Sequence, residues 1–173
     1  MLHALARPGE RNPGAAAGDL EDWGPTPEGR EVVRVMGSGL ATGALTGSRD
    51  GQRLAPLMAP GAEGACVFGE LGYLSAFLAY ADHGVIYRFI PRGGLATEME
   101  VLWLVDAAAR EVEDYDVEAL TWLWEVTSLA DKRIIERNQQ GVASRFYRPG
   151  PFSLMEPGAR QYVDRYVADL AAI

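Results

Sequence analysis

Asp131 is the carboxylate whose place in the sequence most directly suggests chemistry. Helical spacing puts it on one face with Ile134, Ile135 and Asn138. A carboxylate on an apolar helix face is costly to bury unless it is paired, hydrogen-bonded or bound to a metal. The plainer interpretation is that Ser128 begins a helix and that Asp131 accepts backbone N–H bonds in its first turn. The spacing alone favours the first-turn acid, and it does not exclude a metal ligand.

The two histidines, His3 and His83, offer little toward a metal centre by themselves. His83 stands in the turn Asp82-His83-Gly84, where a histidine beside an acid usually lies in solvent or forms a loop hydrogen bond. His3 lies two residues from the start and is a poor ligand alone. The one cysteine, Cys66, cannot form an intrachain disulfide, a cysteine-based zinc site or a complete iron–sulfur cluster.

Two further groups of residues have a chemical and a structural interpretation. The acids around Tyr115 could bind a cation, but a solvated loop with Asp116 as a helix N-cap explains them more simply. Several aromatic side chains could surround a cationic substrate, although their spacing favours an ordinary core: Tyr87, Phe89, Trp103, Trp122 and Trp124. The sequence has no phosphate-binding glycine loop, GxSxG or HExxH motif, which argues against Rossmann enzymes and common hydrolases.

Length and composition indicate one globular domain. The chain has 173 residues, 48% of them hydrophobic, and a net charge of −8. This acidic balance argues against a nucleic-acid partner. We expect no membrane span, because no run of 18 apolar residues exists, and the start does not resemble a signal peptide. A single free cysteine then favours a cytoplasmic location.

The chain falls into a loop-rich segment, residues 1–64, and a regular part, residues 65–173, of the same domain. Turn-forming residues dominate the first segment, where we predict a strand at 31–36 and a long loop at 40–63. Alternating apolar residues predict strands at 65–71, 75–81, 84–91 and 97–105, with a hairpin turn at 82–84. Helices are predicted after Asp116, from Ser128 to a C-terminal Gly141, and from Glu156 or Pro157 onward.

Strands followed by helices predict an α+β fold, with an antiparallel sheet packed against C-terminal helices. Such a sheet and a long C-terminal helix often leave a cavity between them. We expect the helices to cover one face of the sheet.

Residues 65–170 resemble the C-terminal part of the catalytic domain of Rieske non-haem iron oxygenase large subunits. The most specific match is T-x-x-x-D-K-x-x-x-E-x-x-Q-x-G followed by S-x-x-Y-x-P-G-P-x-S-x-x-E, which runs from Thr127 to Glu156. It is most similar to the branch that includes carnitine, choline and glycine betaine monooxygenases. The resemblance implies a helix-grip, START-like catalytic domain, of which this chain holds an incomplete part.

The resemblance implies that Asp131 is a metal ligand. In that family two histidines and one carboxylate hold a mononuclear Fe(II), with open positions for dioxygen. The histidines, and the cysteines and histidines of the [2Fe–2S] cluster, belong to segments upstream of the matching region, and their motifs are absent here. The chain thus has an incomplete iron site and cannot bind the cluster. Full-length relatives work with a reductase or ferredoxin and are homotrimers.

The expected function is therefore oxygenation of an aromatic ring or a quaternary ammonium compound by O2 and non-haem Fe(II). We expect the chain to be truncated and inactive alone, and to need the missing Rieske half or a separately encoded partner. Two alternatives remain: a non-enzymatic helix-grip module that binds a small ligand, and a gene remnant. Loss of part of the domain would also expose strand edges and favour self-association.

Overall fold

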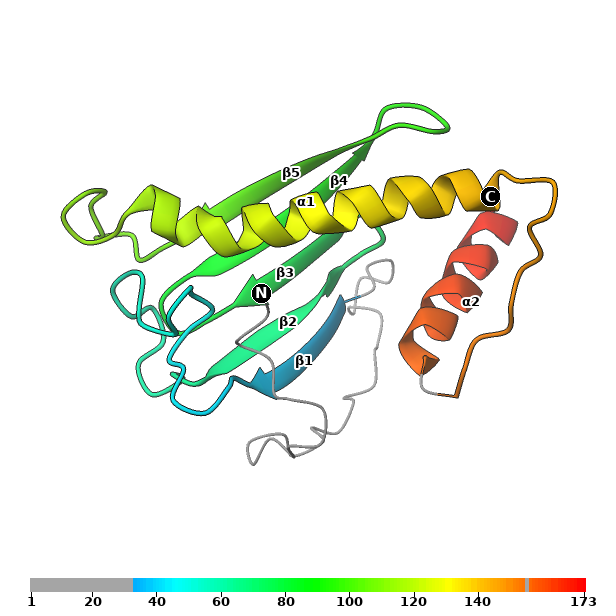
Figure 1. Ribbon diagram of the computed structural model, residues 1–173. Helices are drawn as coiled ribbons and strands as arrows, with labels where there is room; N and C mark the ends of the chain where they lie inside the picture. Colours follow the sequence, from blue (N-terminus) through cyan, green and yellow to red (C-terminus); the bar gives the residue numbers. More distant parts are fainter. Residues whose placement is uncertain (1–32, 155) are drawn as a thin grey trace. The chain divides into compact units, whose positions relative to one another are not determined.

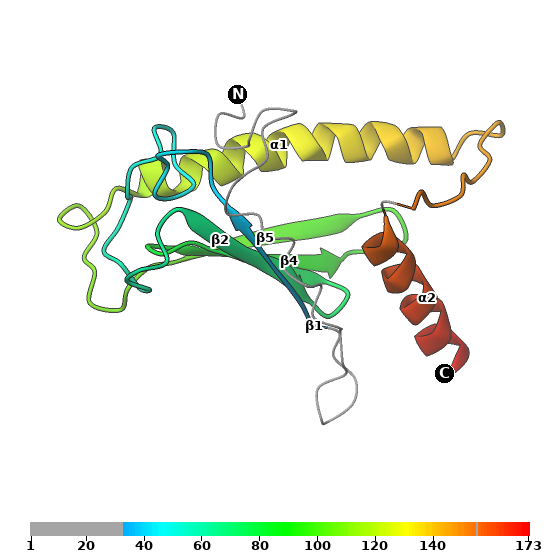
Figure 2. The same cartoon turned by 90° about the horizontal axis from the view of Figure 1, so that it is seen from below.

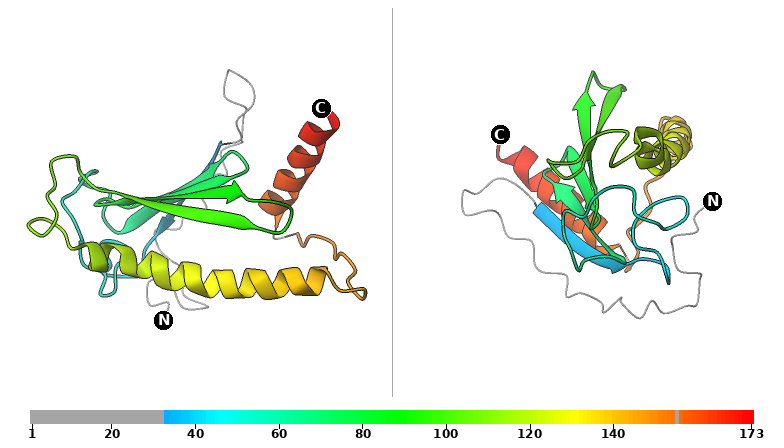
Figure 3. Two further views of the ribbon diagram at one scale, coloured as in Figure 1. Left: turned by 90° about the horizontal axis from the view of Figure 1, so that it is seen from above. Right: turned by 90° about the vertical axis from the view of Figure 1, so that its left-hand side faces the viewer.

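The computed structural model describes residues 33–154 and 156–173. Five antiparallel strands follow one another along the chain and across the sheet in the order β1-β2-β3-β4-β5 (Figure 1). They are β1 (Val33–Gly39), β2 (Ala65–Leu71), β3 (Ser75–Ala79), β4 (Gly84–Pro91) and β5 (Thr97–Leu104). The predicted antiparallel meander is confirmed, since each strand pairs in the antiparallel direction with the strand that follows it in sequence (Figure 3).

Strand boundaries agree closely with the hydrophobic alternation. The predicted turn at residues 82–84 joins β3 to β4, where the Tyr80 N–H donates to the His83 carbonyl over 2.8 Å. The loop between β1 and β2 is long and contains only turns and bends, as predicted. The predicted first strand is described only from residue 33, and residues 1–32, with His3, lie outside the described part.

One face of the sheet carries the core. Val85 is fully buried and pairs across the strands with Trp103, while Tyr87 pairs with Val101. Trp124, from the helix that follows the sheet, joins Val85 and Tyr80 in the same cluster. Tyr87 meets Trp124 edge-on, with ring centroids 6.2 Å apart. The aromatic residues at strand and helix spacing therefore form mainly a core, as their spacing favoured.

The opposite face of the sheet is apolar and only partly covered within the described residues. Val67 on β2 and Leu102 and Leu104 on β5 are each at least 40% exposed. Strand alternation places them on the face away from the Val85 cluster. The sheet therefore has one packed face and one face whose apolar side chains reach solvent.

The first helix, α1 (Val117–Val142), begins where predicted and is longer than predicted. The Asp116 carboxylate accepts a 2.8 Å hydrogen bond from the Ala119 N–H, which confirms the N-cap. The prediction of a second helix beginning at Ser128 and ending at Gly141 was wrong, because α1 continues through both residues. A polar residue at capping spacing does not end a helix when the backbone bonds on either side stay satisfied.

The chain divides into two compact units, residues 1–127 and 128–173. The first contains the sheet and the first turns of α1, which lie over the Val85 face of the sheet (Figure 2). The second contains the rest of α1 and a second helix, α2 (Pro157–Ala171), which confirms the predicted start near Glu156. Sheet strands followed by helices confirm the α+β class.

Trp124 links α1 to the sheet, and its removal should destabilise the first unit. We expect Trp124→Ala to lower the free energy of unfolding by about 3 kcal/mol or more, because it leaves a cavity between helix and sheet. Urea unfolding followed by circular dichroism measures this change. Val126→Ala on the same helix is the control and should cost less than about 1 kcal/mol, since Val126 is 45% exposed. Equal losses in the two variants would contradict this packing.

Candidate functional site

Asp131, the residue that the motif predicts as an iron ligand, lies in the middle of α1. Its side chain is exposed in this chain. Because no helix begins at Ser128, the interpretation of Asp131 as a first-turn acid was wrong. Its neighbours Ile134 and Ile135 are each 63% exposed, so within these residues they do not shield the carboxylate from water.

The described residues do not themselves make an iron site. Over residues 33–154 and 156–173, no three His, Cys, Asp or Glu side chains lie together as a metal site requires. One exposed carboxylate offers a single anionic ligand, while a facial triad requires two imidazoles besides. The residues present therefore do not fit Fe(II) by themselves, and Asp131 stays a predicted ligand that depends on groups from elsewhere.

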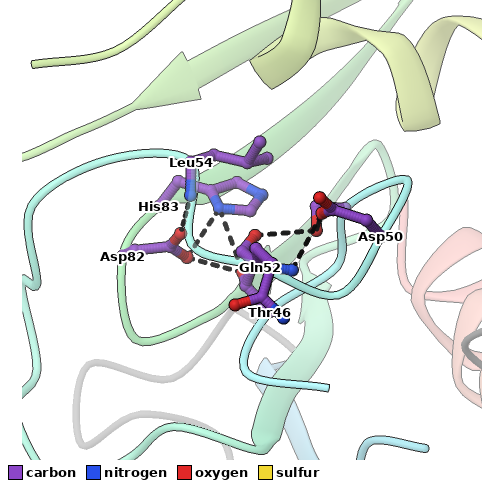
Figure 4. A network of polar contacts seen from close by, with 7 residues as sticks. Thr46, Asp50, Gln52, Leu54, Asp82 and His83 are labelled. Atoms are coloured by element: carbon purple, nitrogen blue, oxygen red, sulfur yellow. Dashed lines mark hydrogen bonds and ion pairs between the residues drawn. The ribbon is translucent and has the colours of Figure 1, made fainter. Parts of the chain in front are cut away.

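A second cluster, which the sequence analysis did not assemble, lies at the turn between β3 and β4. Thr46, Asp82 and His83 are all fully buried there (Figure 4). The Thr46 hydroxyl donates to Asp82 Oδ1 over 2.6 Å, and His83 Nδ1 lies 2.9 Å from the same oxygen. The other carboxylate oxygen, Oδ2, accepts a 2.8 Å bond from the Leu54 N–H. Asp82 thus joins the long loop to the hairpin.

Neighbouring backbone bonds hold the same loop against the hairpin. The N–H groups of Met58 and Ala59 both donate to the carbonyl oxygen of Ala81, at 2.8 and 2.9 Å. Nearer the loop's bend, Asp50 accepts a 3.0 Å bond from the Gln52 N–H (Figure 4). The loop that covers His83 is therefore fixed at several points along its length.

The environment of Asp82 keeps it ionised. Burial alone would raise its pKa, but hydrogen bonds from His83, Thr46 and the Leu54 N–H outweigh burial and lower the pKa to about 2. The Asp82 carboxylate is therefore charged at neutral pH, with three donors around it. Such a carboxylate holds the histidine ring in one orientation.

His83 extends this polar cluster into the aromatic core. Its ring stacks on Tyr80, with centroids 4.8 Å apart, and Tyr80 in turn lies 6.2 Å from Trp124. Tyr80 fits closely against Gly47, where an added Cβ would lie 2.5 Å from the phenol ring and its oxygen. Burial raises the pKa of the Tyr80 hydroxyl and of the Cys66 thiol, so both stay protonated. The cluster therefore presents neutral aromatic groups beside one buried ion.

The sequence analysis placed His83 correctly in a turn but not in solvent. Of the two alternatives given for it, the hydrogen bond is confirmed, since His83 Nδ1 lies 2.9 Å from Asp82 Oδ1, and the solvent position was wrong, because the loop between β1 and β2 leaves the ring fully buried. Thr46 was not singled out at all, since it lies 36 residues from Asp82 in the chain. The acids around Tyr115 lie in an exposed loop, as the simpler interpretation predicted. There, Arg110 forms ion pairs with Glu113 and Asp114.

Comparison with known proteins identifies the class. Residues 74–172, more than half of the chain, match the family described as ring hydroxylating alpha subunit (catalytic domain). The chain belongs to this family. The match includes β4, β5, both helices and Asp131.

Among similar curated proteins are oxygenase subunits of glycine betaine monooxygenases. The subunit from Chromohalobacter salexigens is 40% identical over 86 residues, which are 49% of this chain and 19% of that protein. The subunit from Pseudomonas aeruginosa PAO1 is 37% identical over the same length, 49% of this chain and 20% of that protein. The matched part of the chain thus spans about a fifth of these relatives. No helix in the described residues is long and apolar enough to cross a membrane.

The ionised Asp82 predicts a loss of stability in acid. Its pKa is lower in the folded protein than the ordinary 3.8, so its stabilisation is complete above about pH 4 and lost as the pH falls toward 2. We expect Asp82→Asn to lower the free energy of unfolding at pH 7 by about 2–4 kcal/mol, because one amide oxygen replaces a carboxylate with three donors. Urea unfolding between pH 2 and 7 measures both effects.

Asp164→Asn is the matched control, because Asp164 is an exposed acid paired only at the surface with Arg160. It should change stability by less than about 0.5 kcal/mol at pH 7. An Asp82→Asn protein as stable as this control would show that the three hydrogen bonds contribute little.

Proposed function

We propose that this chain supplies the carboxylate-bearing, C-terminal part of the catalytic domain of a Rieske-type oxygenase that acts on a quaternary ammonium compound. The family match over residues 74–172, which includes Asp131, carries the proposal. The relatives named for glycine betaine monooxygenase support the substrate class.

In this proposal Asp131 is one of three ligands to a mononuclear Fe(II). The other two are histidines from a segment upstream of the matched region, in the same or a partner polypeptide. Asp131 is exposed on α1, whereas an iron ligand is expected to point into the catalytic domain, so the support for this role comes from the family match and not from the position of the side chain. Bound iron would supply dioxygen activation, and this chain would contribute the carboxylate and part of the surrounding wall.

The proposal extends to partners and location. A reductase or ferredoxin would deliver electrons through a [2Fe–2S] cluster that the complete oxygenase holds outside this sequence, and the complete enzyme would be a trimer. We expect a cytoplasmic location. The 173-residue chain by itself would then bind iron well below one equivalent and would not oxidise a substrate.

A chimera tests the proposal directly. Residues 74–172 replace the matching segment of the Chromohalobacter glycine betaine monooxygenase oxygenase subunit, and iron content and reductase-coupled oxygen uptake with glycine betaine are measured. We expect about one mononuclear iron per subunit and substrate-dependent turnover. Asp131→Ala in the chimera should lower both iron content and turnover more than about tenfold. Loss of a residue that only hydrogen-bonds to a metal ligand typically lowers metal affinity or activity tenfold or more, and Asp131 would bind the metal directly.

The control is Asp164→Ala, which removes an exposed helical acid of the same unit and should leave iron content and turnover unchanged. Full iron occupancy and turnover in the Asp131→Ala chimera would refute the assignment of this residue. Stoichiometric iron in the 173-residue chain alone would refute the claim that the site needs groups from outside it.

A further inference from the structure

One face of α1 is buried in the first turns of the helix and exposed further along. Leu120 and Trp124 are 4% and 9% exposed, and Trp124 packs with Tyr80 and Val85. Because α1 runs to Val142 without a break, positions 131, 135, 138 and 142 continue the face of these two residues at helical spacing. The helix therefore extends a face that packs against the sheet into turns where the same face reaches solvent.

In those later turns the face is apolar around one carboxylate. We call it the Asp131 stripe, which consists of Asp131, Ile134, Ile135, Asn138 and Val142. Ile134 and Ile135 are each 63% exposed. The opposite side of the same turns is mainly polar and includes Arg133 and Glu136. A helix with one apolar and one polar side normally packs its apolar side against other polypeptide, so this stripe is a surface that requires a cover.

The carboxylate determines what kind of surface can cover the stripe. A cover that packs on Ile134 and Ile135 also removes water from Asp131, which lies one turn away on the same face. Burial of an ionised carboxylate is costly unless a hydrogen-bond donor or a positive charge meets it. The covering surface must therefore be apolar around an N–H or positively charged group that faces Asp131.

A second copy of this chain is too small a cover. Two isoleucines and one valine per copy fall far short of the about 800 Å² that each partner of a stable interface buries. The longer relatives offer a larger one. The matched segment makes up 19% of the Chromohalobacter subunit, so about four fifths of that protein lies outside the match.

We propose that the Asp131 stripe is the docking surface for the rest of the catalytic domain. The partner is polypeptide that the longer relatives have outside the matched segment, and it presents apolar side chains around a donor or positive charge. Docking turns the exposed stripe into an interior surface and places Asp131 inside the completed domain. The inference rests on the proposed function for the identity of this partner, and it does not depend on bound iron.

Thiol labelling of two sites on the helix tests the docking surface. Ile135→Cys places a thiol in the stripe, and Arg133→Cys places the matched control on the opposite side. Each is made in the 173-residue chain and in the chimera, and peptide mass spectrometry follows the reaction with a maleimide at each position. We expect both thiols to react at similar rates in the 173-residue chain. In the chimera, position 135 should react at least about a hundredfold more slowly, while position 133 stays fast.

Thermal unfolding gives a second measurement that needs no label. In the chimera, Ile134→Ala combined with Ile135→Ala should lower the Tm by about 5 °C or more, because the completed domain buries both side chains. In the 173-residue chain the same pair should change the Tm by less than about 2 °C, since both side chains are exposed. If the chimera does not fold, the Chromohalobacter subunit with substitutions at the corresponding positions replaces it in both measurements.

Every outcome decides the proposal. Fast labelling of position 135 in the completed domain, or equal Tm changes in the two proteins, overturns it. Slow labelling of position 135 in the 173-residue chain overturns it as well: a second copy covers the stripe if the protection increases with protein concentration, and the chain itself does if it does not.

Failure of this inference can be told apart from failure of the proposed function. Protection of position 135 in a chimera whose iron does not depend on Asp131 supports the docking surface and refutes the ligand. Iron that depends on Asp131 in a chimera with an unprotected position 135 supports the ligand and refutes the docking surface.

Discussion

The buried carboxylate of Asp82 is the interaction on which the first unit most depends. Taking a carboxylate out of water is unfavourable, and here three hydrogen bonds offset that cost. Two of the three donors come from a loop that precedes β2, and the third is the adjacent His83. One side chain therefore fixes a long irregular segment, the β3–β4 turn and the orientation of an imidazole. The aromatic core under α1 begins at that imidazole, through its stacking on Tyr80.

Local sequence patterns were enough to predict the sheet and the helix starts. Alternation in residues 65–104 and the Asp82-His83-Gly84 turn specify consecutive antiparallel strands, because pairing between sequence neighbours needs no distant information. Asp116 likewise marks the start of α1, since its side chain bonds to a backbone group three residues on. These features depend on interactions within a few residues.

Features that depend on distant contacts were missed. The burial of His83 follows from Thr46 and Leu54, whose contacts with Asp82 span 36 and 28 residues, and no local pattern reports them. The continuity of α1 was missed for a different reason. Ser128 and Asp131 have the spacing of a helix cap, but the backbone of α1 stays helical through both residues. The hydroxyl of the preceding Thr127 donates back to the Leu123 carbonyl, a bond made inside a continuous helix. Asp131 was predicted from the motif that runs from Thr127 to Glu156. Its exposed side chain adds no structural evidence for a chemical role.

Two sites of different character thus follow from one short sequence. In the Asp82 cluster, three donors surround the carboxylate, and His83 Nε2 is buried without a hydrogen-bond partner among the described residues. Asp131 is the reverse: it is a proposed ligand inside the matched family region, and the described residues hold no group of three metal-ligating side chains. The central claim is that Asp131 binds iron once the catalytic domain is complete. The most direct measurement is anomalous X-ray diffraction at the iron edge on crystals of the completed domain. The account predicts an iron peak at bonding distance from an Asp131 carboxylate oxygen, and an iron bound without any contact to that carboxylate would contradict it.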